Sequence, residues 1–237
     1  MPEYKIITDR IDSADYRVKF LAHPIISRGR PQITTVEIPG KGTLTQKEDT
    51  YTDTTVELQL NIVAQNADED AMQLFVSFVS ELSLSDRLYL YELHGNFFRI
   101  KSMEVSDYNQ VSDRDIEFTA TIVCDPGEYI EDGRISYDYL DSKLKQNVYS
   151  ECHPTYQITG NGQCTITVNG KSMTATVGGT LVIDTGRMLA YQSDASIQNA
   201  VVTGDYEDLY FKTGNNPISI TAGFELKVTP NWEVRIP

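Results

Sequence analysis

The sequence predicts a mainly β protein with two domains and a single convincing α-helix. Three observations carry this prediction: apolar and polar residues alternate in many short runs, one segment alone has clear helical periodicity, and the sequence changes character near residue 135. The first domain, residues 1–135, is expected to be a β-sandwich or α+β fold that contains the helix. The second, residues 136–237, is expected to be an antiparallel β-sandwich. With 237 residues the chain can form two modest domains, each with a core.

The strands of the first domain are predicted by apolar side chains at every second position. Such alternation occurs over residues 56–62 and again over residues 116–122. A hairpin is predicted where Leu88–Leu93 and Phe97–Lys101 flank the turn sequence His94-Gly95-Asn96.

The helix is predicted to begin after Asn66, which can serve as its N-cap, with Glu69 completing a near capping box. Asp68, Glu69 and Asp70 would then lie in the first turn, where the helix dipole favours negative charge. Apolar residues recur at intervals of three and four and predict a face that packs on a sheet: Ala71, Phe75, Phe78, Val79 and Leu82.

The segment Pro39–Thr55 is rich in glycine, proline and threonine, a composition typical of turns and exposed strands. It predicts a long exposed hairpin or arm. Because an isolated hairpin has marginal stability, we expect a partner surface to order it.

The second domain is predicted from many short strands with regular turn signals. Residues 136–151 fit either a short helix or a linker. Asn169-Gly170 predicts a two-residue hairpin turn between Gln163–Val168 and Lys171–Val177, and Gly178-Gly179 predicts a further turn. More strands are expected in five later segments: Met188–Tyr191, Ala200–Thr203, Leu209–Lys212, Ile218–Thr221 and Phe224–Val228.

The chain is acidic, with 20 basic and 34 acidic residues and a net charge of −14. A chain of this charge repels nucleic acid, so sequence-specific DNA or RNA binding is not expected. Residues 1–135 hold 13 basic and 24 acidic residues, and residues 136–237 hold 7 and 10. The acidic excess of the first domain serves either solubility or a dedicated acidic surface.

No membrane partner is expected, because no apolar run approaches the ~20 residues of a membrane helix. The N-terminus lacks the basic and apolar stretches of a signal peptide, so synthesis in a cytoplasm is expected. The three cysteines, Cys124, Cys152 and Cys164, have no standard zinc spacing, and neither a metal nor any other cofactor is expected. Cys124 and Cys164 fit strand patterns as small buried side chains.

Catalysis is not expected either, and we assign no catalytic, cofactor-binding or metal-binding residue. The histidines His23, His94 and His153 lie in unrelated local contexts, and no motif of a hydrolase, phosphate-binding loop or zinc protease occurs. The acidic run Asp205–Asp208 lacks the spacing of a calcium-binding loop.

The order of these features resembles the distal tail protein (Dit) family of long-tailed phages and prophages that infect mainly Gram-positive bacteria. In the first half the shared stretches are Gly29-Arg30-Pro31, Val36–Leu44, Tyr51-Thr52-Asp53, Leu88–Tyr91 and Phe118–Pro126. In the second half they are Cys152-His153-Pro154, Asn161-Gly162, Ile166–Gly170, Ile183-Asp184, Asn216–Ile220 and Val228–Trp232. The resemblance covers almost the whole chain and rests on the shared order of these stretches.

The resemblance implies a structural hub of the virion tail tip, or baseplate, rather than an enzyme. In such phages the N-terminal domains form a hexameric ring, which can stack on a second ring. The ring joins the tail-tube protein to the tail-associated lysin or fibre protein, and DNA only passes through its lumen. A galectin-like C-terminal domain projects outward and carries receptor-binding or baseplate proteins during host attachment.

An alternative function is a lectin-like module that binds sugars of the host cell wall. Galectin-type sites stack a sugar on a tryptophan, and this chain has one, Trp232. The polar residues that orient the sugar in true galectins are missing around it. We therefore expect Trp232 to pack in the sandwich or near the seam between the domains.

Overall fold

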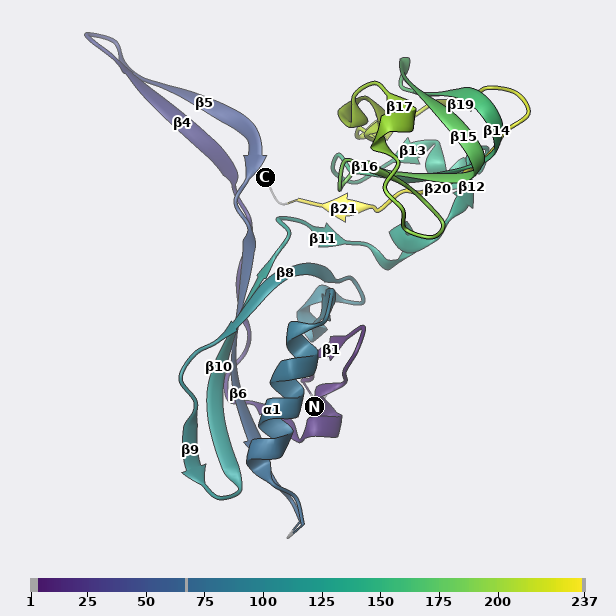
Figure 1. The fold of residues 1–237 in the computed structure, drawn as a ribbon. Coiled ribbons are helices and arrows are strands. Elements are labelled where there is room, and N and C mark those ends of the chain that lie inside the picture. Colours follow the sequence, from purple (N-terminus) through teal and green to yellow (C-terminus); the bar gives the residue numbers. More distant parts are fainter. Residues whose placement is uncertain (1–3, 67, 236–237) are drawn as a thin grey trace. The chain divides into compact units, whose positions relative to one another are not determined.

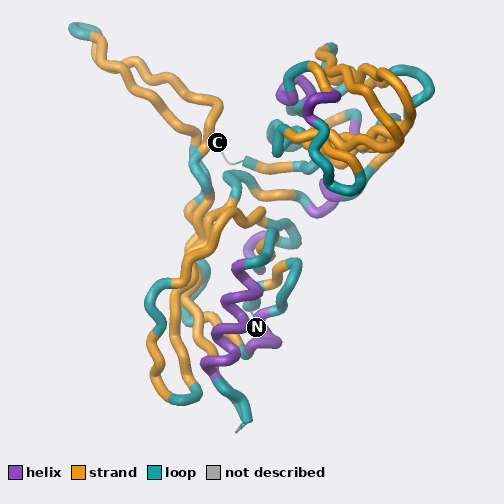
Figure 2. The backbone as a smooth tube through the Cα atoms, viewed as in Figure 1, coloured by secondary structure: helices purple, strands orange, loops and turns teal. Residues whose placement is uncertain are grey.

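The computed structural model describes residues 4–66 and 68–235, without the side chains of residues 47–49. The chain is mainly β with one α-helix, as predicted, and strands run through most of both parts (Figures 1 and 2). It divides into two compact units, the first reaching to Glu128 and including Arg235, the second spanning Tyr129–Val234. None of the helices in the described ranges is long and apolar enough to cross a membrane.

The first unit is built on an antiparallel sheet with the strand order β1-β7-β8-β10-β6-β2, in which β3 also pairs with β6 and β9 with β10. Its strands are β1 (Ile7–Thr8), β2 (Val18–Phe20), β3 (Ile25–Ser27), β6 (Thr54–Val63), β7 (Arg87–Tyr89), β8 (Phe98–Val105), β9 (Asn109–Ser112) and β10 (Asp115–Cys124). The predicted alternation over residues 56–62 and 116–122 is confirmed, because β6 and β10 pair and bury every second side chain.

Helix α1 (Ala71–Ser83) covers one face of this sheet (Figure 1). Its predicted apolar face is confirmed: Ala71, Phe75, Phe78 and Leu82 are buried and Val79 packs against them. Phe75 and Phe78 meet the ring of Phe118 on β10, with centroids 4.9 and 6.1 Å apart. The core of the first unit therefore lies between α1 and the sheet.

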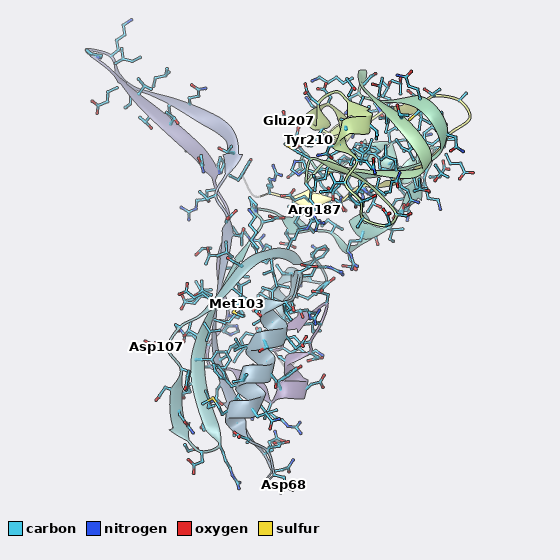
Figure 3. The ribbon with its side chains drawn as sticks, viewed as in Figure 1. Asp68, Met103, Asp107, Arg187, Glu207 and Tyr210 are labelled. Atoms are coloured by element: carbon cyan, nitrogen blue, oxygen red, sulfur yellow. The ribbon has the colours of Figure 1, made fainter. Side chains whose placement is uncertain are left out.

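The predicted start of the helix is wrong by one turn. The N-cap is Asp70, whose carboxylate accepts the backbone N–H groups of Met72 and Gln73. Asp68 and Glu69 precede the helix, and Asp68 lies in the loop before it (Figure 3). The short Asp70 side chain satisfies the free N–H groups of the first turn, while Glu69 accepts backbone bonds from Gln65 and Asn66 instead.

The predicted hairpin around His94-Gly95-Asn96 is confirmed, since β7 pairs with β8 through Leu88 and Phe98. Its first strand is shorter than expected, because Tyr91–Leu93 form a 3-10 helix. His94 and Gly95 both have positive φ, which closes this connection.

The second unit is an antiparallel sandwich-like arrangement with the main strand order β12-β20-β14-β15-β16, in which β19 also pairs with β14 and β17 with β15. The strands are β12 (Tyr137–Asp138), β14 (Thr155–Val168), β15 (Lys171–Asp184), β16 (Leu189–Gln192), β17 (Val202–Thr203), β19 (Ile218–Ile220) and β20 (Glu225–Thr229). Two small sheets add β13 (Gln146–Asn147) to β18 (Gly214–Asn215), and β11 (Glu128–Tyr129) to β21 (Glu233–Val234).

The turn at Asn169-Gly170 is confirmed, but the turn predicted at Gly178-Gly179 is wrong. Strand β15 continues without interruption through these glycines and stays paired with β14 over its whole length. The glycines allow a bend: Gly179 has positive φ and lies opposite Gly160. A Cβ atom on Gly160 would lie 2.4 Å from the ring of Phe224, so only glycine fits there.

Residues 136–151 contain a short helix rather than only a linker. Ser142–Leu144 form a 3-10 helix, and Leu144 is fully buried in the core of the second unit. Residues 129–135 also lie with this unit and include a 3-10 helix at Glu131–Arg134.

Candidate functional site

The most exposed structural element of the first unit is the hairpin formed by β4 (Pro31–Ile38) and β5 (Gly42–Tyr51), which we call the arm. It extends away from the sheet as a two-stranded ribbon (Figure 1). The predicted exposed hairpin is confirmed, but Pro39–Gly42 is its turn and its first strand begins earlier, at Pro31. As far as the structure describes it, the core of this unit includes no side chain of β4 or β5.

The two faces of the arm differ in polarity. Partners across a hairpin share a face, so Val36 and Leu44, which pair, lie on the same face as Ile38. Val36 and Leu44 are 53% and 57% exposed. The opposite face carries Glu37, Thr43, Thr35 and Thr45 over the same length. Near its tip the arm thus presents an apolar stripe on one face, while Ile33, which is 56% exposed, lies on the other face nearer the root. Within the described residues nothing in its own chain covers the stripe.

The root of the arm is fixed by close backbone contacts. Gly29 donates its N–H to the Thr54 hydroxyl, and Arg30 donates to the Thr52 hydroxyl. The Thr54 hydroxyl in turn donates to the carbonyl of Pro126. A Cβ atom on Gly29 would lie 2.3 Å from the carbonyl oxygen of Thr52, so this position requires glycine.

Charged side chains surround this root. Lys101 lies 2.6 Å from Asp53 and 3.4 Å from Asp125. Burial opposes the charge of Lys101, but the bond to Asp53 and the charges of Asp125 and Asp53 outweigh it, so the pKa of Lys101 is raised. The Arg28 guanidinium binds Glu128 at 2.9 Å and lies over the ring of Phe98. These contacts hold the base of the arm to the sheet.

The sheet face opposite α1 is polar. Because Val56 and Ile122 point toward the helix, their neighbours Glu57 and Thr121 point the other way. Thr121 lies between Glu57 on β6 and Glu104 on β8, which makes one row across three strands. Glu117 lies on the same face, four residues before Thr121 on β10. This face therefore carries three glutamates, together with Lys19, which pairs with Asn61 beside Glu117.

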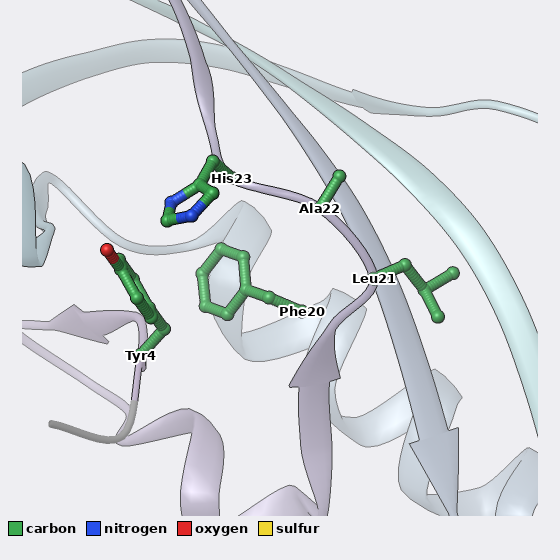
Figure 4. Close-up of a pocket in the computed structure, with 5 residues that line it drawn as sticks. All are labelled: Tyr4, Phe20, Leu21, Ala22 and His23. Atoms are coloured by element: carbon green, nitrogen blue, oxygen red, sulfur yellow. The ribbon is translucent and has the colours of Figure 1, made fainter. Parts of the chain in front are cut away.

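An aromatic hollow of about 370 Å³ lies beside β2 (Figure 4). Its lining residues are Tyr4, Phe20, Leu21, Ala22 and His23. Within this lining the rings of Tyr4 and His23 meet edge to face, with centroids 4.8 Å apart.

Two of the three histidines, although their local sequence contexts are unrelated, are linked in the fold through two tyrosines. His23 packs edge-on against Tyr4, Tyr4 contacts Tyr91, and Tyr91 contacts His94. No signal in the sequence joins these residues, since they come from separate segments. His153 lies in the second unit against Tyr210, with ring centroids 4.3 Å apart.

The cysteines and Trp232 lie in the cores. Cys124, Cys152 and Cys164 are buried, and none of them forms a disulfide within the described residues. Trp232 is 6% exposed and packs beside Phe211 and Tyr149, which confirms the expectation that it lies in the sandwich. In residues 4–66 and 68–235 no cluster of three or more histidine, cysteine or acidic side chains could hold a metal.

The fold has solved counterparts. The crystal structure of the Dit protein (gp 19.1) of phage SPP1 superposes with a TM-score of 0.55 and 14% identity, covering 95% of this chain and 97% of that one. The chain has the fold of a phage Dit protein.

Two structures of the phage P2 baseplate in its activated conformation agree with this result. The form with Ca has a TM-score of 0.50 and 13% identity, and the form with Sr has 0.51 and 14%. Both cover 95% of this chain and 97% of the matched chain. No family model matches the sequence, and no curated protein matches it. The SPP1 Dit protein is described as a paradigm of the hub of the adsorption apparatus in phages that infect Gram-positive bacteria.

Proposed function

We propose that this chain is a non-enzymatic hub subunit of a phage tail tip, and that its N-terminal domain assembles into a hexameric ring. The observation that carries the proposal is the likeness to the SPP1 hub protein over nearly the full length of both chains. A likeness restricted to one unit would support a shared module only. The domains proposed for these roles are residues 1–135 for the ring and residues 136–237 for a galectin-like sandwich.

The arm supports self-assembly. Its apolar stripe of Val36, Ile38 and Leu44 is exposed in the single chain, and covering apolar surface contributes about 25 cal/mol per Å². The arm, residues 31–51, contains two lysines and three acidic residues, so its own net charge is close to zero in a chain whose net charge is −14. The support for self-assembly therefore comes from the exposed apolar stripe rather than from the charge of the arm.

The ring would join the tail-tube protein to a tail-associated lysin or fibre protein, with receptor-binding or baseplate proteins on the second domain. The protein would be made in the host cytoplasm and reside at the virion tail tip. DNA would pass through the lumen without sequence-specific recognition.

The mass of the purified protein in solution, measured by light scattering together with negative-stain images, tests the proposal. Rings with the mass of six 26.7 kDa chains are the expected result. A protein that stays monomeric at all concentrations and binds a glycan measurably would contradict the hub proposal and favour the lectin-like module.

A further inference from the structure

A second hollow, of about 260 Å³, lies in the second unit between residues 139–145 and residues 215–218. The first wall follows β12 and includes the 3-10 helix at Ser142–Leu144. The second wall is the turn between β18 and β19. The lining is formed by Tyr139, Leu140, Leu144, Lys145, Asn215, Asn216, Pro217 and Ile218.

Both walls are held in place by buried contacts. Leu144 is fully buried, and Asn216 is 1% exposed. The Asn216 side chain accepts the N–H of Lys212 and donates to the carbonyls of Lys212 and Gly214. Its backbone N–H donates to the carbonyl of Lys145, which ties one wall to the other. The hollow is therefore preformed, so a ligand would not have to order it.

The mouth of the hollow is apolar. Leu140 is 65% exposed, and Tyr139, Pro217 and Ile218 continue the apolar lining inward. Binding sites for side chains are commonly apolar hollows with a few polar groups at the edge, as here. An aliphatic or aromatic side chain would fill the space.

Four lysines and two aspartates occur in the segments that form or adjoin this hollow. Lys145 lines the hollow, and Lys143 lies two residues before it, with its ammonium 5.1 Å from the ring centroid of Tyr137. Lys212 donates its N–H to Asn216, and Lys227 lies opposite Asp138 on β20.

In the described residues none of these four lysines takes part in an ion pair, although the chain is strongly acidic. Two carboxylates lie nearby: Asp138 accepts the N–H of Leu140, and Asp141 accepts the N–H of Lys143. Both shape the wall through backbone bonds. Elsewhere in the same unit Lys171 and Arg187 have carboxylate partners.

We propose that this hollow binds an extended acidic segment of another protein, with one apolar side chain inserted beside Leu140 and flanking carboxylates facing the lysines. The lysine in the lining favours an acidic segment over a basic one as the occupant. The proposal rests on the proposed hub function and names the chemistry of the partner that the second domain would carry.

The test uses the whole chain and fluorescein-labelled octapeptides in an anisotropy titration. The first peptide has a central leucine–phenylalanine pair with three glutamates on each side. The second has lysines in place of the glutamates, and the third has serines in place of the central pair. We expect the first peptide to bind at least about tenfold more tightly than either control.

Variants locate the binding. Leu140→Asp and Lys145→Glu should each weaken binding of the first peptide by about tenfold or more. The matched controls are Ile197→Asp, at an exposed residue bridged to β16 on the other edge of the sheet, and Lys19→Glu in the first unit. Both controls should bind as the unaltered protein does.

The proposal is overturned if the three peptides bind alike, if none shows saturable binding up to about 1 mM, or if Leu140→Asp and Lys145→Glu bind unchanged. The mass of the assembly, measured in the same samples, separates this failure from failure of the hub. Rings without peptide binding refute only the hollow, whereas a monomer that binds the peptide refutes only the ring.

Discussion

At the scale of single residues, burial decides whether Trp232 can bind a sugar. Trp232, the one tryptophan, has its indole between Phe211 and Tyr149 and is almost closed to solvent. A sugar ring stacks on an exposed aromatic face, which Trp232 does not offer. The residue that first suggests a lectin is thus part of the sandwich core.

Trp232→Ala should therefore lower the free energy of unfolding by about 3–5 kcal/mol, because it leaves a large cavity. Urea denaturation measures this, with Ile197→Ala at an exposed position as the control of small effect. Calorimetric titration of the unaltered protein with cell-wall glycans should show no sub-millimolar binding. Tight binding that disappears in Trp232→Ala would reverse the interpretation of the second domain.

The thiols should remain unpaired, and no zinc should bind. Burial, with the charges of Asp125 and Asp53, raises the pKa of Cys124 to about 12. In the unfolded chain this thiol ionises near pH 9, so from about pH 9 to 12 the unfolded state binds fewer protons and stability falls as pH rises.

Urea denaturation of Cys124→Ser and of the unaltered protein from pH 8 to 11 tests whether ionisation of this thiol lowers the free energy of unfolding. The serine variant should lose less stability over this range. Mass spectrometry before and after reduction tests whether the thiols are unpaired, and elemental analysis tests whether zinc is bound. A disulfide between Cys152 and Cys164, or stoichiometric zinc, would contradict the prediction.

At the scale of elements, the N-terminus of helix α1 is capped by Asp70 rather than by Asn66. Asp70→Ala should cost about 1 kcal/mol, because Met72 and Gln73 lose the acceptor of their backbone N–H groups. Asn66→Ala should cost less, since Asn66 lies before the helix and caps neither group. Equal losses for the two variants in urea denaturation would show that the helix begins earlier than Ala71.

The arm is the element that ring assembly should need. Replacing Thr34–Gln46 by an Asn-Gly turn removes the apolar stripe and closes the shortened hairpin at Ile33 and residue 47, which pair. The shortened chain should keep the thermal midpoint of its folded unit but lose the ring in light scattering.

A matched pair of single changes sharpens this test. Val36→Asp, on the apolar face, should weaken the ring, whereas Thr35→Asp, on the opposite face, should leave it nearly unchanged. Normal rings from the shortened chain would exclude the arm as the assembly element.

At the scale of the whole molecule, charge bears on the lumen that a ring would enclose. If the acidic sheet face with Glu57, Glu104 and Glu117 lines that lumen, it would repel DNA, which carries one negative charge per ~1.7 Å of axis. At physiological salt the repulsion would extend about 8 Å, enough to keep DNA from adhering to the wall. The alternative is that these acids face outward and serve solubility.

Reversing all three glutamates to lysine should make rings retain linear duplex DNA but not a covalently closed circle, which cannot thread a ring. The control reverses Asp15, Asp68 and Asp86, which are exposed and away from this face. The control rings should bind linear and circular DNA alike, if at all, in a mobility-shift assay. Equal retention of circles by the first variant would place the glutamates outside the lumen.

Local signals in the sequence determined much of this protein. The alternation in β6 and β10, the apolar face of α1 and the Asn169-Gly170 turn all follow from period and turn chemistry, which neighbouring residues set by themselves. The exposed hairpin was predictable as well, because its composition excludes it from a core. The order of these elements along the chain was enough to indicate a Dit-like fold.

Only the tertiary structure decided the features that depend on contacts between distant segments. Gly178-Gly179 resembles a turn locally, but pairing with Gly160 and Asn161 keeps it inside a strand. The sequence around Leu144 is compatible with a linker, but the folded second unit buries this residue fully in its core. Lys145 and Asn216 lie side by side because the backbone N–H of Asn216 donates to the carbonyl of Lys145. His23 and His94 share one aromatic cluster through Tyr4 and Tyr91. Sequence periodicity records which side of an element is buried, whereas the identity of the group packed against it is set only when the chain folds.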